Sequence, residues 1–128
     1  MSARDSVLDG LRHDLDAAAE TLAPPPLLRY RAMFGGLGVY ADGPMFASLS
    51  GEGLALKLPP ADRQELIERW GAIPLQYGPD SPVSKSKVVI PAAVRSDPER
   101  LAGWVARSIA FSAADAPKSK AGRRNSGS

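Results

Sequence analysis

The sequence of 128 residues contains no cysteine, which excludes disulfides, thiolate metal sites and a cysteine nucleophile. It also has no apolar run near the ~20 residues that a membrane-spanning helix needs. Charges at Arg4, Asp5, Asp9, Arg12 and Asp14 exclude the apolar segment of a signal peptide from the start of the chain. We therefore expect a soluble, cytoplasmic protein that does not enter the membrane.

Catalytic combinations are also missing. His13 is the only histidine, and no serine lies in the G-x-S-x-G pattern of an activated nucleophile. Carboxylates near His13 leave a metal site conceivable, but their spacing favours a solvated helix face. Asp62, Glu65 and Glu68 fall at helical spacing among arginines, which is typical of a surface charge ladder. We expect a protein that is not an enzyme and needs no cofactor or metal.

Charge is distributed unevenly along the chain. The formal net charge is +2, but residues 1–117 hold 12 basic and 14 acidic residues, so the excess of positive charge lies in the tail. Residues 118–128 contain no apolar side chain larger than alanine and are predicted to form a disordered basic tail. The tail either solubilises the protein or makes weak, nonspecific contacts with nucleic acid. Its four cations are Lys118, Lys120, Arg123 and Arg124.

Hydrophobic periodicity divides residues 1–117 into helices and strands. A stripe of leucines with spacings of three and four predicts a helix over residues 4–22, which ends before Pro24. The period then changes to two, which is typical of strands. The candidate strands cover residues 27–33, 37–41, 45–49 and 54–58, and the first two are either separate or one strand bent at Gly35-Gly36.

The second half of the chain contains two more helices and two more strands. The second helix is predicted over residues 61–70, and the two strands over residues 73–77 and 85–90. A last helix begins at Ser96-Asp97-Pro98-Glu99, where Ser96 is expected to cap it, and ends near Ala114. The order α-β-β-β-α-β-β-α predicts a single α+β domain over residues 1–117, with helices packed against an antiparallel-rich sheet.

One motif resembles a known family. Around the first turn of the predicted sheet stand Arg31, Met33, Phe34, Gly35, Gly36, Gly38, Asp42 and Gly43. With Tyr40 and the following M-F-A, this pattern is similar to the signature of the TfoX N-terminal domain, and the resemblance covers about residues 5–114. It implies the arrangement α-β(3)-α-β(2)-α and an interaction domain. Full-length members of that family carry a second helical domain and promote transcription of competence genes with the cyclic-AMP receptor protein.

The same glycines also match G-x-G-x-x-A, a pattern found in dinucleotide-binding loops. Such a loop must open a helix, whose first amides meet the pyrophosphate. The residues after Gly38 alternate like a strand instead. We therefore interpret these glycines as residues that allow bends in the sheet.

The predicted strand register suggests a surface for interaction. A loop over residues 42–44 would pair Tyr40 with Phe46, and the next hairpin would set Phe46 opposite Lys57. These three side chains would form a row on the face away from the helices. The row is either a structural ladder or a patch that binds an unidentified protein or a second copy of the chain. If the folded body bound nucleic acid, the candidates are Arg29, Arg31, Lys85 and Lys87.

Overall fold

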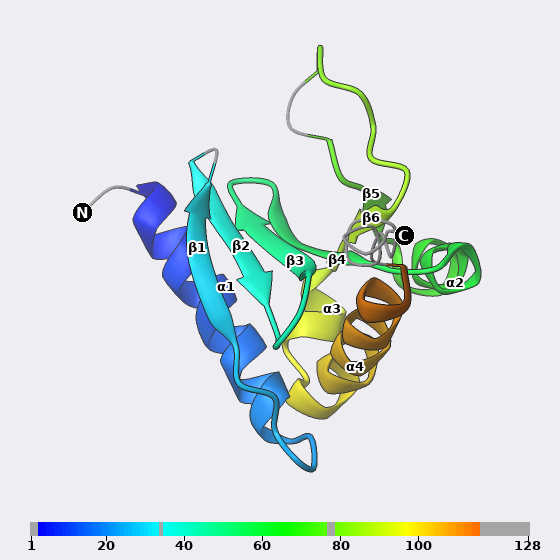
Figure 1. Ribbon diagram of the computed structural model, residues 1–128. Coiled ribbons are helices and arrows are strands. Elements are labelled where there is room, and N and C mark those ends of the chain that lie inside the picture. Colours follow the sequence, from blue (N-terminus) through cyan, green and yellow to red (C-terminus); the bar gives the residue numbers. More distant parts are fainter. Residues whose placement is uncertain (1–2, 34, 77–78, 116–128) are drawn as a thin grey trace, which may run out of the picture.

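The computed structural model describes residues 3–33, 35–76 and 79–115, which form one antiparallel sheet with helices on one of its faces (Figure 1). Along the chain, the elements are α1 (Ala3–Glu20), β1 (Arg29–Met33), β2 (Gly36–Tyr40), β3 (Met45–Ser50), β4 (Gly53–Lys57), α2 (Pro60–Trp70), β5 (Ile73–Pro74), β6 (Lys87–Val89), α3 (Ala92–Arg95) and α4 (Pro98–Asp115). The strand order in the sheet is β1-β2-β3-β4-β6-β5. The predicted α+β class is confirmed.

The first two candidate strands are separate and form a hairpin. Gly35 turns the chain with a φ of 77°, a value that few residues other than glycine adopt. β1 and β2 then pair from Arg29 opposite Tyr40 to Met33 opposite Gly36. The sheet therefore has four strands before α2, one more than the three in the expected order.

The start of the last helix differs from the prediction. Asp97, and not Ser96, caps α4, because its Oδ1 accepts hydrogen bonds from the amides of Glu99 at 3.1 Å and Arg100 at 3.3 Å. Ser96 instead ends α3, a short helix that the periodicity did not predict. The residue that ends one helix is thus followed directly by the residue that caps the next.

The main core lies between the sheet and the helices α1 and α4. Both helices contact β3, β4 and each other, and Figure 1 shows them on the same side of the sheet. Trp104 of α4 is 7% exposed and belongs to this core. The fully buried side chains of this layer include Leu15, Val39, Leu49, Leu54, Leu56, Val88, Leu101 and Val105.

A β-bulge interrupts the pairing of β2 with β3. Val39 pairs with Ala47 and Tyr40 pairs with Met45, so Phe46 is an extra residue on β3. The Ser108 hydroxyl of α4 lies 2.9 Å from the Phe46 carbonyl oxygen and 2.8 Å from the Lys57 carbonyl oxygen, and these two acceptors share its single O–H proton. Helix α4 is thus fastened to the strand at the bulge.

The bulge corrects the predicted register. Tyr40 was expected opposite Phe46, but its partner is Met45. Phe46 is only 1% exposed and belongs to the hydrophobic core, so it is not part of an interaction surface. The prediction assumed regular pairing on both sides of the hairpin, and one extra residue on β3 is enough to remove Phe46 from the row.

Candidate functional site

The face of the sheet opposite α1 and α4, which we call the helix-free face, holds the surface that the sequence singled out. Residues paired across neighbouring antiparallel strands share a face, and successive residues alternate between faces. Arg29 therefore lies on the same face as Tyr40, and Tyr40 on the same face as Met45. Two of the predicted residues, Tyr40 and Lys57, remain candidates, and Met45 takes the place of Phe46.

Methionine side chains cover the part of this face that is formed by β1, β2 and β3. A Cβ placed on Gly38 would lie 2.6 Å from Sδ of Met33 and 2.8 Å from Sδ of Met45, so both thioethers lie over the glycine. Tyr40 lies beside them, with its ring carbon 3.6 Å from the same point. Methionine is flexible and polarisable, and surfaces that adapt to a partner often use it.

Beneath these long side chains, the strands carry small residues. Gly38 pairs with Ser48, and Ser48 pairs with Ala55. The Ser48 hydroxyl is buried and has no hydrogen-bond partner among the described residues. A buried hydroxyl without a hydrogen-bond partner is unfavourable in a folded protein.

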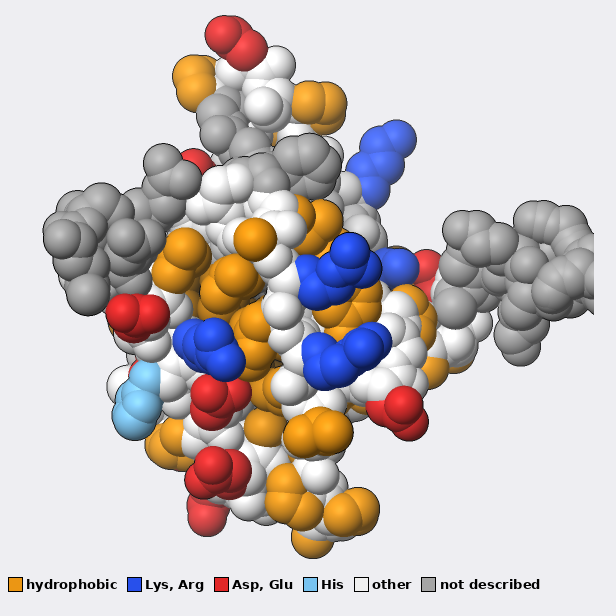
Figure 2. Space-filling model, turned by 60° about the vertical axis from the view of Figure 1, so that its left-hand side comes forward, with side chains coloured by type: hydrophobic (Ala, Val, Ile, Leu, Met, Phe, Trp, Pro, Cys, Tyr) orange, Lys and Arg blue, Asp and Glu red, His pale blue; other side chains and the backbone are white. Residues whose placement is uncertain are grey.

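Basic side chains surround the apolar part of the helix-free face. Arg29 and Arg31 project from β1, and both are exposed. Lys57 and Lys87 pair on β4 and β6. Figure 2, which turns the β1 side of the molecule forward, shows Lys and Arg side chains interspersed with hydrophobic ones. This mixture suits a partner surface that is partly apolar and carries negative charge.

The two lysines have different electrostatic surroundings. The Nζ of Lys57 lies 3.1 Å from Oδ2 of Asp115, at the end of α4. The pKa of Lys87 is lowered, first by burial, which disfavours its charged form, and then by the positive charge of Lys57.

The glycines of the motif serve the sheet. Gly36 and Gly38 lie within β2, which leads into a turn and not into a helix, so a dinucleotide loop is absent from this place. A Cβ on Gly36 would lie 2.2 Å from the carbonyl oxygen of Leu49, which explains why only glycine fits. Asp42 has a φ of 58° in the turn before β3, a conformation that aspartate tolerates better than most residues.

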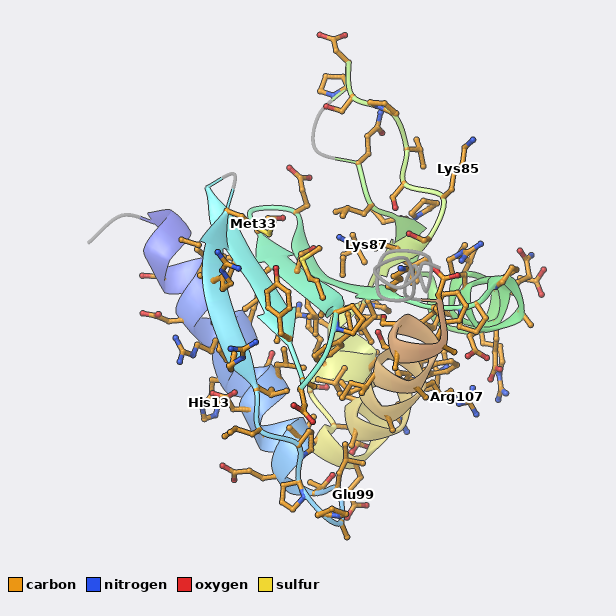
Figure 3. The ribbon with its side chains drawn as sticks, viewed as in Figure 1. His13, Met33, Lys85, Lys87, Glu99 and Arg107 are labelled. Carbon is orange, nitrogen blue, oxygen red and sulfur yellow. The ribbon has the colours of Figure 1, made fainter. Side chains whose placement is uncertain are left out.

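Other predicted residues lie apart from this surface. His13 is exposed on α1, and the described residues contain no group of three or more histidines and carboxylates placed to hold a metal ion. Lys85 is exposed in the connection between β5 and β6 and points away from the sheet (Figure 3). Phe34, the boundary at residue 117 and the tail cations Lys118, Lys120, Arg123 and Arg124 lie outside the described residues.

A comparison with protein families agrees with the motif and the fold. The family model of the TfoX N-terminal domain matches residues 20–112. The chain belongs to the TfoX N-terminal domain family. No match was found among curated proteins. Within this TfoX N-terminal domain, no helix of the described residues is long and apolar enough to cross a membrane.

Sequence reasoning missed two features of the surface. Regular pairing would place Met45 on the core side of the sheet, and only the bulge moves it opposite Tyr40. The pairing of Lys57 with Lys87 was also missed, because β4 and β6 are separated by α2 and β5 in the sequence. The motif drew attention to the correct hairpin but did not reveal its partner strands.

Proposed function

We propose that the protein is a non-enzymatic interaction domain in transcriptional regulation, and that its helix-free face binds an acidic surface of a partner protein. The observation that carries this proposal is the combination of Tyr40, Met33 and Met45 with basic residues on one face. Aromatic residues, methionine and arginine are enriched in protein interfaces. The regulatory role is an extension of the family resemblance to this TfoX N-terminal domain.

The buried serines of the described residues lack the neighbouring base that a nucleophilic serine needs. The hydroxyls of Ser48 and Ser112 are buried without partners, but neither has a histidine beside it to act as a base, since His13 is exposed on α1. Binding through a face of a sheet needs no such chemistry. It needs a rigid sheet. The hydrogen bonds of Ser108 in α4 to the backbone of β3 and β4 help to make the sheet rigid.

The proposal can be tested by capturing partners with the full chain and with two variants. The Tyr40→Ser, Met45→Ser double variant alters the helix-free face. Val7→Ser alters an exposed hydrophobic residue on α1 and serves as the matched control. We expect the parent and the control to bind the same protein, and the purified partner to bind the double variant about tenfold or more weakly. A double variant that folds and binds its partner with unchanged affinity would contradict the proposal.

A second candidate function, association with nucleic acid, is favoured by the cations Arg29, Arg31 and Lys87 on the same face. Phosphate contacts release counterions, so such binding must weaken steeply as salt rises. A variant with glutamine at Lys118, Lys120, Arg123 and Arg124 separates the tail from the folded body. If this variant still binds nucleic acid in a salt-sensitive way, the result favours nucleic-acid binding by the folded body. Capture of a protein partner in nuclease-treated lysate favours protein binding.

A further inference from the structure

Among the directly opposed residues of the described strands, Lys57 of β4 and Lys87 of β6 carry like charges. Lys57 lies directly opposite Lys87, and both lie on the helix-free face because their neighbours Leu56 and Val88 point into the core. Like charges directly opposite each other destabilise a pair of strands. The sheet therefore keeps an unfavourable contact at a place where neutral side chains would be more stable.

Asp115 compensates only part of this charge. Its Oδ2 lies 3.1 Å from the Nζ of Lys57. The side chain of Asp115 is 52% exposed and that of Lys57 is 23% exposed. Among the described residues, no carboxylate forms an ion pair with Lys87. The group of Lys57, Lys87 and Asp115 thus holds one positive charge that no described residue balances.

We infer that Lys57 and Lys87 form a binding site for one carboxylate of the partner protein. This inference rests on the proposed function and names the chemistry of one contact in it. A lysine ammonium carries three donors that can rotate, so two of them can hold the two oxygens of a single carboxylate. One carboxylate neutralises the remaining positive charge of this group. A doubly charged phosphate would leave the group with an excess of negative charge beside Asp115.

The surroundings of Lys87 strengthen such a contact. Burial and the charge of Lys57 lower the pKa of Lys87, and an anion beside it would reverse the second of these effects. Val89, two residues further along β6, lies on the same face and is half-buried. Reduced contact with water strengthens an ion pair relative to one on an open surface.

The site can be tested without knowing the partner, by using acetate as the probe. The full chain contains five lysines, and 13C labels at their ε-carbons give each a separate nuclear magnetic resonance signal. Acetate is added against chloride at constant ionic strength. We expect the signals of Lys57 and Lys87 to shift and saturate, and the signal of the exposed Lys85 to stay in place. Equal shifts at all three lysines would mean general screening and would overturn the site.

Two variants test the charge argument. Asp115→Asn removes the internal competitor, and we expect acetate to bind it roughly two- to fivefold more tightly. Lys87→Gln should abolish the saturable shift of Lys57, whereas Lys87→Arg, which keeps the charge, should preserve it. Weaker binding by Asp115→Asn, or unchanged binding by Lys87→Gln, would overturn the inference. Phosphate that binds the parent more tightly than acetate would overturn the assignment to a carboxylate.

These outcomes are independent of the capture experiment. One outcome is that acetate binds at the two lysines, but the Tyr40→Ser, Met45→Ser variant still binds the partner protein. That outcome would support the carboxylate site and contradict the proposed docking face. Partner binding that is lost in that variant but unchanged in Lys87→Gln would retain the docking face and reject the carboxylate site. Binding of the partner should fall about tenfold in Lys87→Gln and stay unchanged in the control Lys85→Gln if both are correct.

Discussion

The two faces of the sheet are built from the same strands but with different side chains. The face toward α1 and α4 carries branched aliphatic residues such as Val39, Leu54 and Leu56, which are fully buried. The helix-free face carries very small residues, such as Gly38 and Ala55, and the long side chains of Met33 and Met45 lie over Gly38. The arrangement on the side of α1 and α4 is typical of a packed core, in which close packing holds each side chain in one conformation.

The second arrangement has a different physical character. Small residues leave the backbone of the sheet close to the surface, and the methionines above them can change rotamer without disturbing the strands. The basic side chains Arg29, Arg31 and Lys57 add charge that a core would not tolerate. The face toward α1 and α4 holds the fold together, and we expect substitutions on the helix-free face to cost less stability.

The strongest test of this difference uses two neighbours in sequence, Phe46 and Met45. Phe46→Ala should reduce the free energy of unfolding by about 3–5 kcal/mol, because it leaves a cavity in the core. Met45→Ala should reduce it by about 1 kcal/mol, because the side chain is only half-buried. Denaturant unfolding of both variants measures the difference. Equal losses would show that the bulge does not separate these residues into a core and a surface position.

A second comparison uses two glycines of the family motif. Gly36→Ala should destabilise the protein by roughly 1–3 kcal/mol, because its Cβ would overlap the backbone of Leu49, which cannot move aside. Gly38→Ala meets only the ends of Met33 and Met45, which can swing away, so its effect should be below about 1 kcal/mol. Thermal unfolding distinguishes the two, and a larger loss for Gly38→Ala would contradict the flexibility assigned to the helix-free face.

The smallest effect concerns two tyrosines, one on each face. The Tyr30 hydroxyl donates to Oδ1 of Asp16 in α1 at 2.6 Å, and burial together with this bond raises its pKa above the usual value of about 10. Because the folded pKa is the higher one, the stabilisation is complete below pH ~10 and is lost as the pH rises from there toward the folded pKa. Tyr30→Phe should lower the free energy of unfolding by about 1 kcal/mol at neutral pH, because the hydrogen bond is gone. The variant should also lack the decline in the free energy of unfolding that this bond causes at alkaline pH.

Tyr40→Phe is the matched control for this measurement. Unfolding in denaturant between neutral and alkaline pH should show the parent's alkaline loss unchanged in Tyr40→Phe, since the bond between Tyr30 and Asp16 remains. A parent whose stability does not decline above pH ~10, or a Tyr30→Phe variant that declines as the parent does, would contradict the role given to this bond.

Local sequence patterns predicted most of the helices and strands and pointed to the family, but they did not predict the short helix α3. Leucines at spacings of three and four predicted α1, and the sequence Ser96-Asp97-Pro98-Glu99 predicted a helix that begins close to the start of α4. The glycine motif marked the place where β1 and β2 meet but left open whether they are separate strands. These features follow from local rules, because caps, turns and periodicity depend on residues near one another in the chain.

The set of residues that share the helix-free face depends on contacts between elements that are far apart in the sequence. The bulge at Phe46 depends on how β3 packs against β2 and α4, and side chains that alternate with a period of two change face when the register shifts by one. The pairing of Lys57 with Lys87, and the approach of Asp115 to Lys57, bring together residues from β4, β6 and the end of α4. No local pattern encodes these contacts, because each one depends on long-range packing of the whole sheet.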